Sequence, residues 1–152
     1  MKKLILALLV VAAGFWFQTH SDGLKAERAS PAIELPSSTS ESLNDQLARA
    51  YEQQLSNLQV RGEGEVLKVL KDDTQGRRHQ RFLLKLASGQ TLLVAHNVDL
   101  APRISSLREG DLIAFHGEYE WNDKGGVVHW THRDPDGRHA DGWLEHKGRR
   151  YQ

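Results

Sequence analysis

The chain opens with a short hydrophobic stretch. Two lysines precede an unbroken apolar run over residues 4–17, an order that is typical of a bacterial export signal. The run is shorter than the roughly 20 residues that a bilayer-spanning helix needs, which favours a cleaved signal. Residues 12–14 form a weak cleavage site, and the bulky residues 15–17 suit an uncleaved membrane anchor equally well. We therefore expect residues 1–20 to be a signal peptide or signal anchor. The protein would be periplasmic or secreted, or held at the inner membrane by its N-terminus.

A polar segment and then an amphipathic segment follow. Residues 21–40 have little apolar content, contain prolines and end in a serine-rich stretch, which predicts a flexible linker. Apolar side chains then recur at helical spacing over residues 41–59, namely Leu43, Leu47, Ala50, Tyr51, Leu55 and Leu58. This pattern predicts an amphipathic helix. It is too brief for a coiled-coil seam, so we expect its apolar side to pack against the following domain.

From residue 60 onward the pattern changes to the alternation of β-strands. Turn-forming residues separate five such segments, over residues 60–70, 79–87, 90–98, 110–121 and 126–132. Residues 101–109 fit only a short helix or a turn. Three meandering strands, a connection and a final hairpin follow the strand order of an OB-fold. The predicted fold is mainly β, with a small OB-fold-like five-stranded barrel over residues 60–152 preceded by the amphipathic helix.

The register of the last hairpin predicts which polar side chains meet. A tight turn over residues 122–125 places Glu118 directly opposite His129 on the outer face, with His116 on the neighbouring diagonal. A slip of one residue would move His129 into the interior instead. We adopt the first register, which gathers histidine and carboxylate groups outside the barrel.

The hairpin of residues 79–98 predicts a second polar cluster. A tight turn about residues 88–89 pairs Phe82 with Ala95 inside and leaves Arg81 opposite His96 outside. OB barrels often bind ligands on this strand pair, although charged residues on an outer strand face are also normal without any ligand. The residues that we expect to contact a ligand are His79, Arg81, His96 and Asn97.

Composition limits the chemistry. The 152 residues include 8 His but 0 Cys, which excludes disulfides, thiolate metal sites and a cysteine nucleophile. The 20 basic and 20 acidic side chains balance, so no overall field attracts a polyanion. An anionic polymer would have to bind a local patch.

Residues 129–139 concentrate histidine and aspartate, which are ligand types that hold zinc or another divalent ion. Within a regular strand, however, His129 and His132 point to opposite faces, so a shared ion requires the strand to end or bulge between them. The alternative is structural, with backbone hydrogen bonds from the histidines and a simple turn at residues 134–137. The candidate metal ligands are His116, Glu118, His129, His132 and His139.

Four short segments carry a family resemblance. They are Arg-His-Gln-Arg-Phe at residues 78–82, Ala-His-Asn at 95–97, Gly-Glu-Tyr-Glu-Trp-Asn at 117–122 and His-Trp-Thr-His at 129–132. Together they resemble a family of small bacterial proteins known only as a domain of unknown function, serial three-four-six-five. The resemblance covers residues 62–152. It implies a domain boundary but no reaction, cofactor or catalytic residue.

These observations leave three hypotheses for function. The first is an exported OB-like binding module whose histidine-rich surface holds a small ligand, a metal or an anionic polymer. The second is a phosphodiesterase or nuclease in which a divalent metal ion activates water. The third is an envelope assembly or interaction factor that docks a partner through its helix and residues 143–151.

Overall fold

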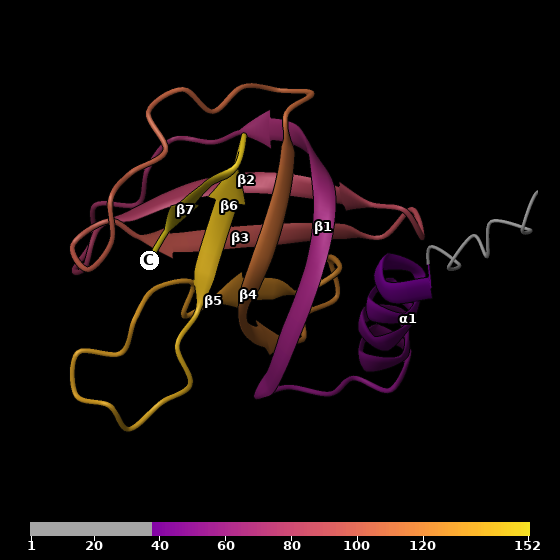
Figure 1. Cartoon of the computed structure of the whole chain (residues 1–152). Coiled ribbons are helices and arrows are strands. Elements are labelled where there is room, and N and C mark those ends of the chain that lie inside the picture. Colours follow the sequence, from indigo (N-terminus) through magenta and orange to yellow (C-terminus); the bar gives the residue numbers. More distant parts are fainter. Residues whose placement is uncertain (1–37) are drawn as a thin grey trace, which may run out of the picture. The chain divides into compact units, whose positions relative to one another are not determined.

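The computed structural model describes residues 38–152, which form one helix and seven strands (Figure 1). The helix is α1 (Ser38–Glu52), and the strands are β1 (Leu58–Val69), β2 (His79–Leu86), β3 (Thr91–Asn97), β4 (Leu112–Glu120), β5 (Val127–His129), β6 (Trp143–His146) and β7 (Arg149–Tyr151). The expected signal at residues 1–20 and most of the expected linker lie outside the described residues. Within the described part, no helix is long and apolar enough to cross a membrane.

The strands form a closed barrel. They follow the order β1-β2-β3-β5-β4, and β4 also pairs with β1, which closes the sheet. The β3–β5 pair is parallel and the other pairs are antiparallel. This mixed, closed, five-stranded arrangement confirms the predicted OB-like fold. Residues 101–109 form turns without a helix.

Helix α1 contributes to the same core as the barrel. Leu47 and Ala50 are fully buried within the core cluster, and the indole N–H of Trp121 donates to the carbonyl of Tyr51 at 3.1 Å. The helix ends at Glu52, seven residues before the predicted end. The backbone N–H groups of residues 54 and 55 bond back to the carbonyls of residues 51 and 50, a Schellman motif.

The register of β2 and β3 differs from the prediction by one residue. Phe82 pairs with Val94 and Gln80 with His96, so His96 points into the interior and is fully buried. The reason is the turn. The backbone N–H of Leu86 donates to the carbonyl of Gln90, so the loop between them has three residues, 87–89. Gly89 closes this odd-numbered loop with a positive φ angle.

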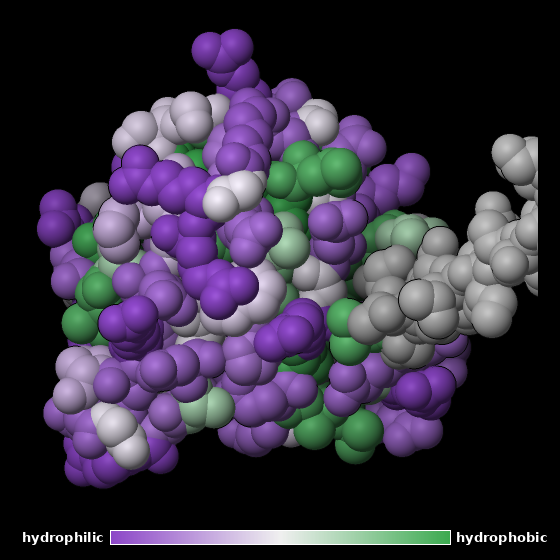
Figure 2. All heavy atoms as spheres, in the orientation of Figure 1, coloured by the Kyte–Doolittle hydropathy of each residue, from purple (hydrophilic) through white to green (hydrophobic). Residues whose placement is uncertain are grey.

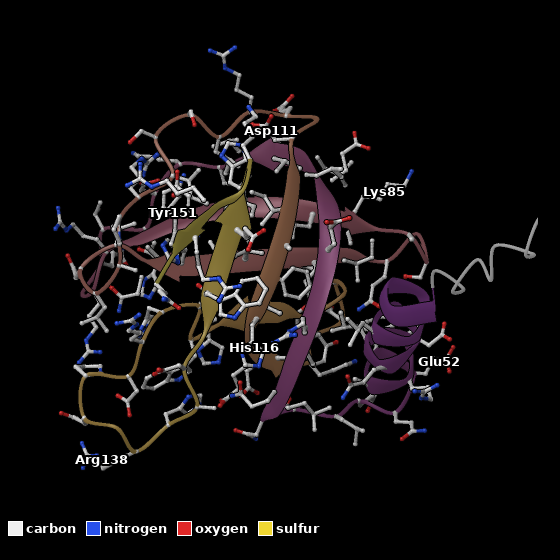
Figure 3. All side chains as sticks on the ribbon, in the orientation of Figure 1. Glu52, Lys85, Asp111, His116, Arg138 and Tyr151 are labelled. Carbon is white, nitrogen blue, oxygen red and sulfur yellow. The ribbon has the colours of Figure 1, made fainter. Side chains whose placement is uncertain are left out.

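A C-terminal hairpin extends the sheet beyond the barrel. Strand β6 pairs with β4, and β7 pairs with β6. Leu144 and Tyr151 of this hairpin are buried in the core. The loop between β5 and β6 reaches out from the barrel, with Arg138 near its tip (Figure 3). It brings a distant histidine back to β4, as described next.

Candidate metal centre and neighbouring hollow

The β4–β5 hairpin places a carboxylate against an imidazole. Glu118 pairs with His129 across the two strands, as the sequence predicts, and Glu120 lies two residues further along the same face of β4. The strands approach closely beside this pair. A Cβ atom at Gly117 would lie 2.4 Å from the carbonyl oxygen of His129, so only glycine fits there.

Three ligand-type side chains converge at this point. The Nε2 atom of His129 lies 3.7 Å from Oε1 of Glu118 and 3.9 Å from Oε1 of Glu120. One ligand atom from each of the three residues lies within 4.8 Å of the others. Tetrahedral zinc, with ligands at about 2.0–2.2 Å, holds its ligand atoms roughly 3.4 Å apart. Small side-chain movements therefore bring this set to coordinating distance.

The imidazole of His129 has an unsatisfied nitrogen. Among the described residues, its Nε2 atom is buried and has no hydrogen-bond partner. Burial lowers the pKa of His129, although the carboxylates of Glu118 and Glu120 act in the opposite direction. In the neutral tautomer whose Nε2 atom carries no proton, the ring faces two carboxylate oxygens that accept but do not donate. A cation between these groups would satisfy all three.

His139, from the β5–β6 loop, contacts the cluster through Glu118. Its Nε2 atom bonds to Oε2 of Glu118, and its ring stacks on Trp130 with centroids 4.1 Å apart. Its Nδ1–H donates to the carbonyl of Ala140 at 2.8 Å, which fixes the orientation of the ring. Burial is the largest single effect and lowers the pKa of His139. The hydrogen bonds with Glu118 and Ala140 and the charges of Glu118 and Asp134 together exceed it, so the net shift is upward.

Asp134 stabilises the conformation of the loop that carries His139. Its carboxylate accepts the backbone N–H groups of Asp136, Arg138 and His139 at 3.2, 2.6 and 2.7 Å. The hydrogen bond from the His139 backbone is the main reason that the pKa of Asp134 is lowered. Residues 134–137 therefore have the turn role that the structural alternative predicts.

The other two candidate metal ligands lie elsewhere. The His116 ring packs against Trp143, with centroids 6.1 Å apart. His132 is buried against Trp130, and its Nδ1–H donates to the carbonyl of Arg133 at 2.7 Å. The structure thus brings Glu118 and His129 together, adds Glu120 to them, and joins His139 to Glu118. Strand alternation, which puts residues 118 and 120 on one face, is the signal that identifies Glu120.

A hollow of about 160 Å³ adjoins this cluster. It joins the two predicted sets, and its lining residues are Arg77, His79, Asn97, His129, Trp130 and His132. A larger hollow of about 340 Å³ lies between β1 and β2, but its lining includes no histidine. The smaller hollow, whose lining includes three histidines, is therefore the candidate ligand site.

Two of the four expected ligand-contacting residues have structural roles. His96 accepts from the hydroxyl of Thr131 at 2.8 Å and donates to the carbonyl of Pro102 at 3.2 Å. Its burial lowers its pKa to about 4. Arg81 donates to the carbonyl of Lys71 at 3.0 and 3.2 Å. Only His79 and Asn97 of the expected set line the hollow.

Fold and site together define a class, a small OB-type β-barrel domain with a histidine–carboxylate cluster on its outer face. The chain belongs to the family described as a protein of unknown function (DUF3465), whose model matches residues 32–152. The predicted family resemblance is confirmed, and the match also takes in α1. Comparison with curated proteins gave no match.

Proposed function

We propose that this protein is an exported binding module that holds a divalent transition-metal ion, of the class of zinc. Glu118, Glu120, His129 and His139 supply the ligand atoms. The observation that carries the proposal is the buried, unpartnered Nε2 atom of His129 facing two carboxylate oxygens. Two imidazoles and two carboxylates form a donor set that suits zinc.

Electrostatics support metal binding over a simple ion pair. A metal ligand must be a neutral imidazole, and burial lowers the pKa of His129 in that direction. The proton on His139 is held by Glu118, and an incoming cation replaces it between the same two atoms. Binding would therefore release the proton that His139 carries.

Three donors converge, and we propose that His139, which is bonded to Glu118, supplies the fourth; a set of four favours holding the ion over hydrolysis. Catalytic zinc sites keep a position open for water, whereas four protein donors fill a tetrahedral shell.

The hypothesis of an assembly factor is weakened for the helix, because Leu47 and Ala50 of α1 are buried against the protein's own barrel and are not available to a partner. The face in Figure 2 is mainly hydrophilic, with its hydrophobic residues in separate small groups.

Zinc titration of metal-free protein tests the proposal. Saturation at about 100 times Kd stabilises the native state by about 2.7 kcal/mol, which raises the melting temperature by roughly 10 °C in a domain of this size. The His129→Ala variant should lose this rise. The matched control is His116→Ala, because His116 shares the face of β4 but packs against Trp143 outside the cluster.

The pattern of results decides the proposal. Wild type and His116→Ala should respond alike to zinc and to EDTA, while His129→Ala responds to neither. A wild-type protein that ignores zinc contradicts the proposal. So does an equal loss of response in both variants, because that would place the ion away from His129.

A further inference from the structure

We infer that the hollow beside the cluster is a binding site for a phosphate-type oxyanion, either free phosphate or the terminal phosphate of a small monoester. This inference extends the proposed function, because His129 contributes to both the hollow and the metal cluster. It names the chemistry of the ligand that the module holds beside its metal.

Size restricts the ligand. Sites for drug-sized molecules have volumes of about 300–1,000 Å³, whereas this hollow has about 160 Å³. Since a water molecule occupies about 30 Å³, the hollow has room for roughly five waters or for one tetrahedral oxyanion. A whole nucleotide does not fit inside it. A terminal phosphate group does.

The lining is rich in hydrogen-bond donors. Arg77 and His79 offer N–H groups. The Oδ1 atom of Asn97 accepts the backbone N–H of Asp99 at 3.0 Å, which leaves the Asn97 amide N–H₂ as its free polar group. No carboxylate lines the hollow. Such a donor set suits an acceptor-only ligand.

Arg77 stands apart from the cations around it. Arg78 is paired with Asp99 at 2.7 Å, and Arg103 is paired with Asp72. Among the described residues, Arg77 has no carboxylate within ion-pair distance, although it lines the hollow. Its guanidinium is thus available for bidentate contact with two phosphate oxygens.

The metal and the anion should bind cooperatively. Glu118 and Glu120 lie 3.7 and 3.9 Å from Nε2 of His129, which lines the hollow, and their negative charges repel an anion there. A divalent cation neutralises them. Coupling of this kind is reciprocal, so phosphate strengthens zinc binding by the same factor as zinc strengthens phosphate binding.

Calorimetric titration of the full chain with inorganic phosphate tests the site, once in EDTA and once with stoichiometric zinc. We expect saturable binding in both, tighter by about fivefold or more with zinc. Arg77→Gln should weaken binding roughly tenfold or more, the effect of losing a charge-assisted hydrogen bond. Lys85→Gln is the charge-matched control, because Lys85 lies on β2 six residues beyond His79, and should change affinity less than about twofold.

A second arm distinguishes the sources of the phosphate group. Glycerol phosphate that binds at least as tightly as inorganic phosphate identifies a monoester, and weaker binding identifies the free ion. Both results depend on Arg77 and support the site. An oligonucleotide without terminal phosphates that binds while phosphate does not overturns it.

Failure of this inference is separable from failure of the metal proposal. Wild-type protein that binds no phosphate in either condition overturns the anion site, while a zinc response without phosphate leaves the metal site intact. Zinc-dependent phosphate binding that is unchanged in Arg77→Gln also overturns the anion site, because the metal alone would then hold the anion. Phosphate binding in EDTA by a protein that ignores zinc supports the hollow and rejects the metal.

Discussion

Single histidines of this domain differ sharply in role. His96 is fully buried, and both of its ring nitrogens are bonded, to Thr131 and to the carbonyl of Pro102. Nearby, the amide of buried Gln80 both donates to and accepts from the backbone of Ile104. These interior polar groups tie the loop at residues 101–109 to the strands, because a buried polar group is stable only when it is paired.

The free energy of unfolding should decrease as the pH decreases, because His96 takes up a proton more readily in the unfolded chain than in the folded protein. Its pKa is about 4 in the folded protein and about 6.5 when exposed in the unfolded chain. The unfolded state therefore takes up the proton first, and stability that is complete above about pH 6.5 is lost as the pH falls toward 4. The full loss is about 3 kcal/mol. Urea unfolding between pH 7 and pH 4.5 measures this.

The control for this prediction is His96→Gln, which does not titrate. Its free energy of unfolding should depend less on pH over the same window. Some dependence will remain, because burial also lowers the pKa values of His116 and His129. Equal slopes in the variant and the wild type would show that His96 is not the titrating group.

At the scale of elements, turns explain which predictions succeed. A turn that joins Asn122 to Gly125 sets the β4–β5 register, so Glu118 meets His129 as predicted. The β2–β3 prediction is wrong for His96, because a three-residue loop shifts the pairing by one. Sequence alternation alone does not reveal an odd-numbered loop. The position of His139 depends on contacts of Asp134 within a long loop, which no periodic pattern encodes.

The C-terminal hairpin shows a missed signal of the same kind. Strands β6 and β7 have only four and three residues, too few for a clear alternation. Their turn, however, is Lys147-Gly148, with positive φ angles of 51° and 75°. Two left-handed residues are the mark of a type I′ turn, for which a glycine is the sequence cue.

This hairpin should contribute strongly to stability. Leu144 is fully buried, so Leu144→Ala leaves a cavity and should cost about 2–5 kcal/mol. Leu112→Ala on the adjacent strand β4 is the matched control. Leu112 is 60% exposed, and its replacement should cost about 0.5 kcal/mol or less. Chemical denaturation measures both, and equal costs would show that β6 does not pack on the core in solution.

At the scale of the whole molecule, the folded unit and the predicted export signal are separate parts of the sequence. The core includes α1 as well as the barrel, and the family match begins at residue 32. The apolar run at residues 4–17 precedes this unit. A chain with 0 Cys forms the same contacts in an oxidising or a reducing compartment, so its fold is compatible with export.

Export is the last prediction, and it rests on the lysines and the apolar run at the start of the chain. A reporter enzyme that is active only outside the cytoplasm, fused after Gln152, should be active in the full chain. Deletion of residues 2–17 is the control and should abolish this activity without altering the folded unit. Fractionation then separates the two modes of export, because a cleaved protein is released with the periplasm and an anchored one stays with the inner membrane. A full-length fusion with no activity outside the cytoplasm would contradict export.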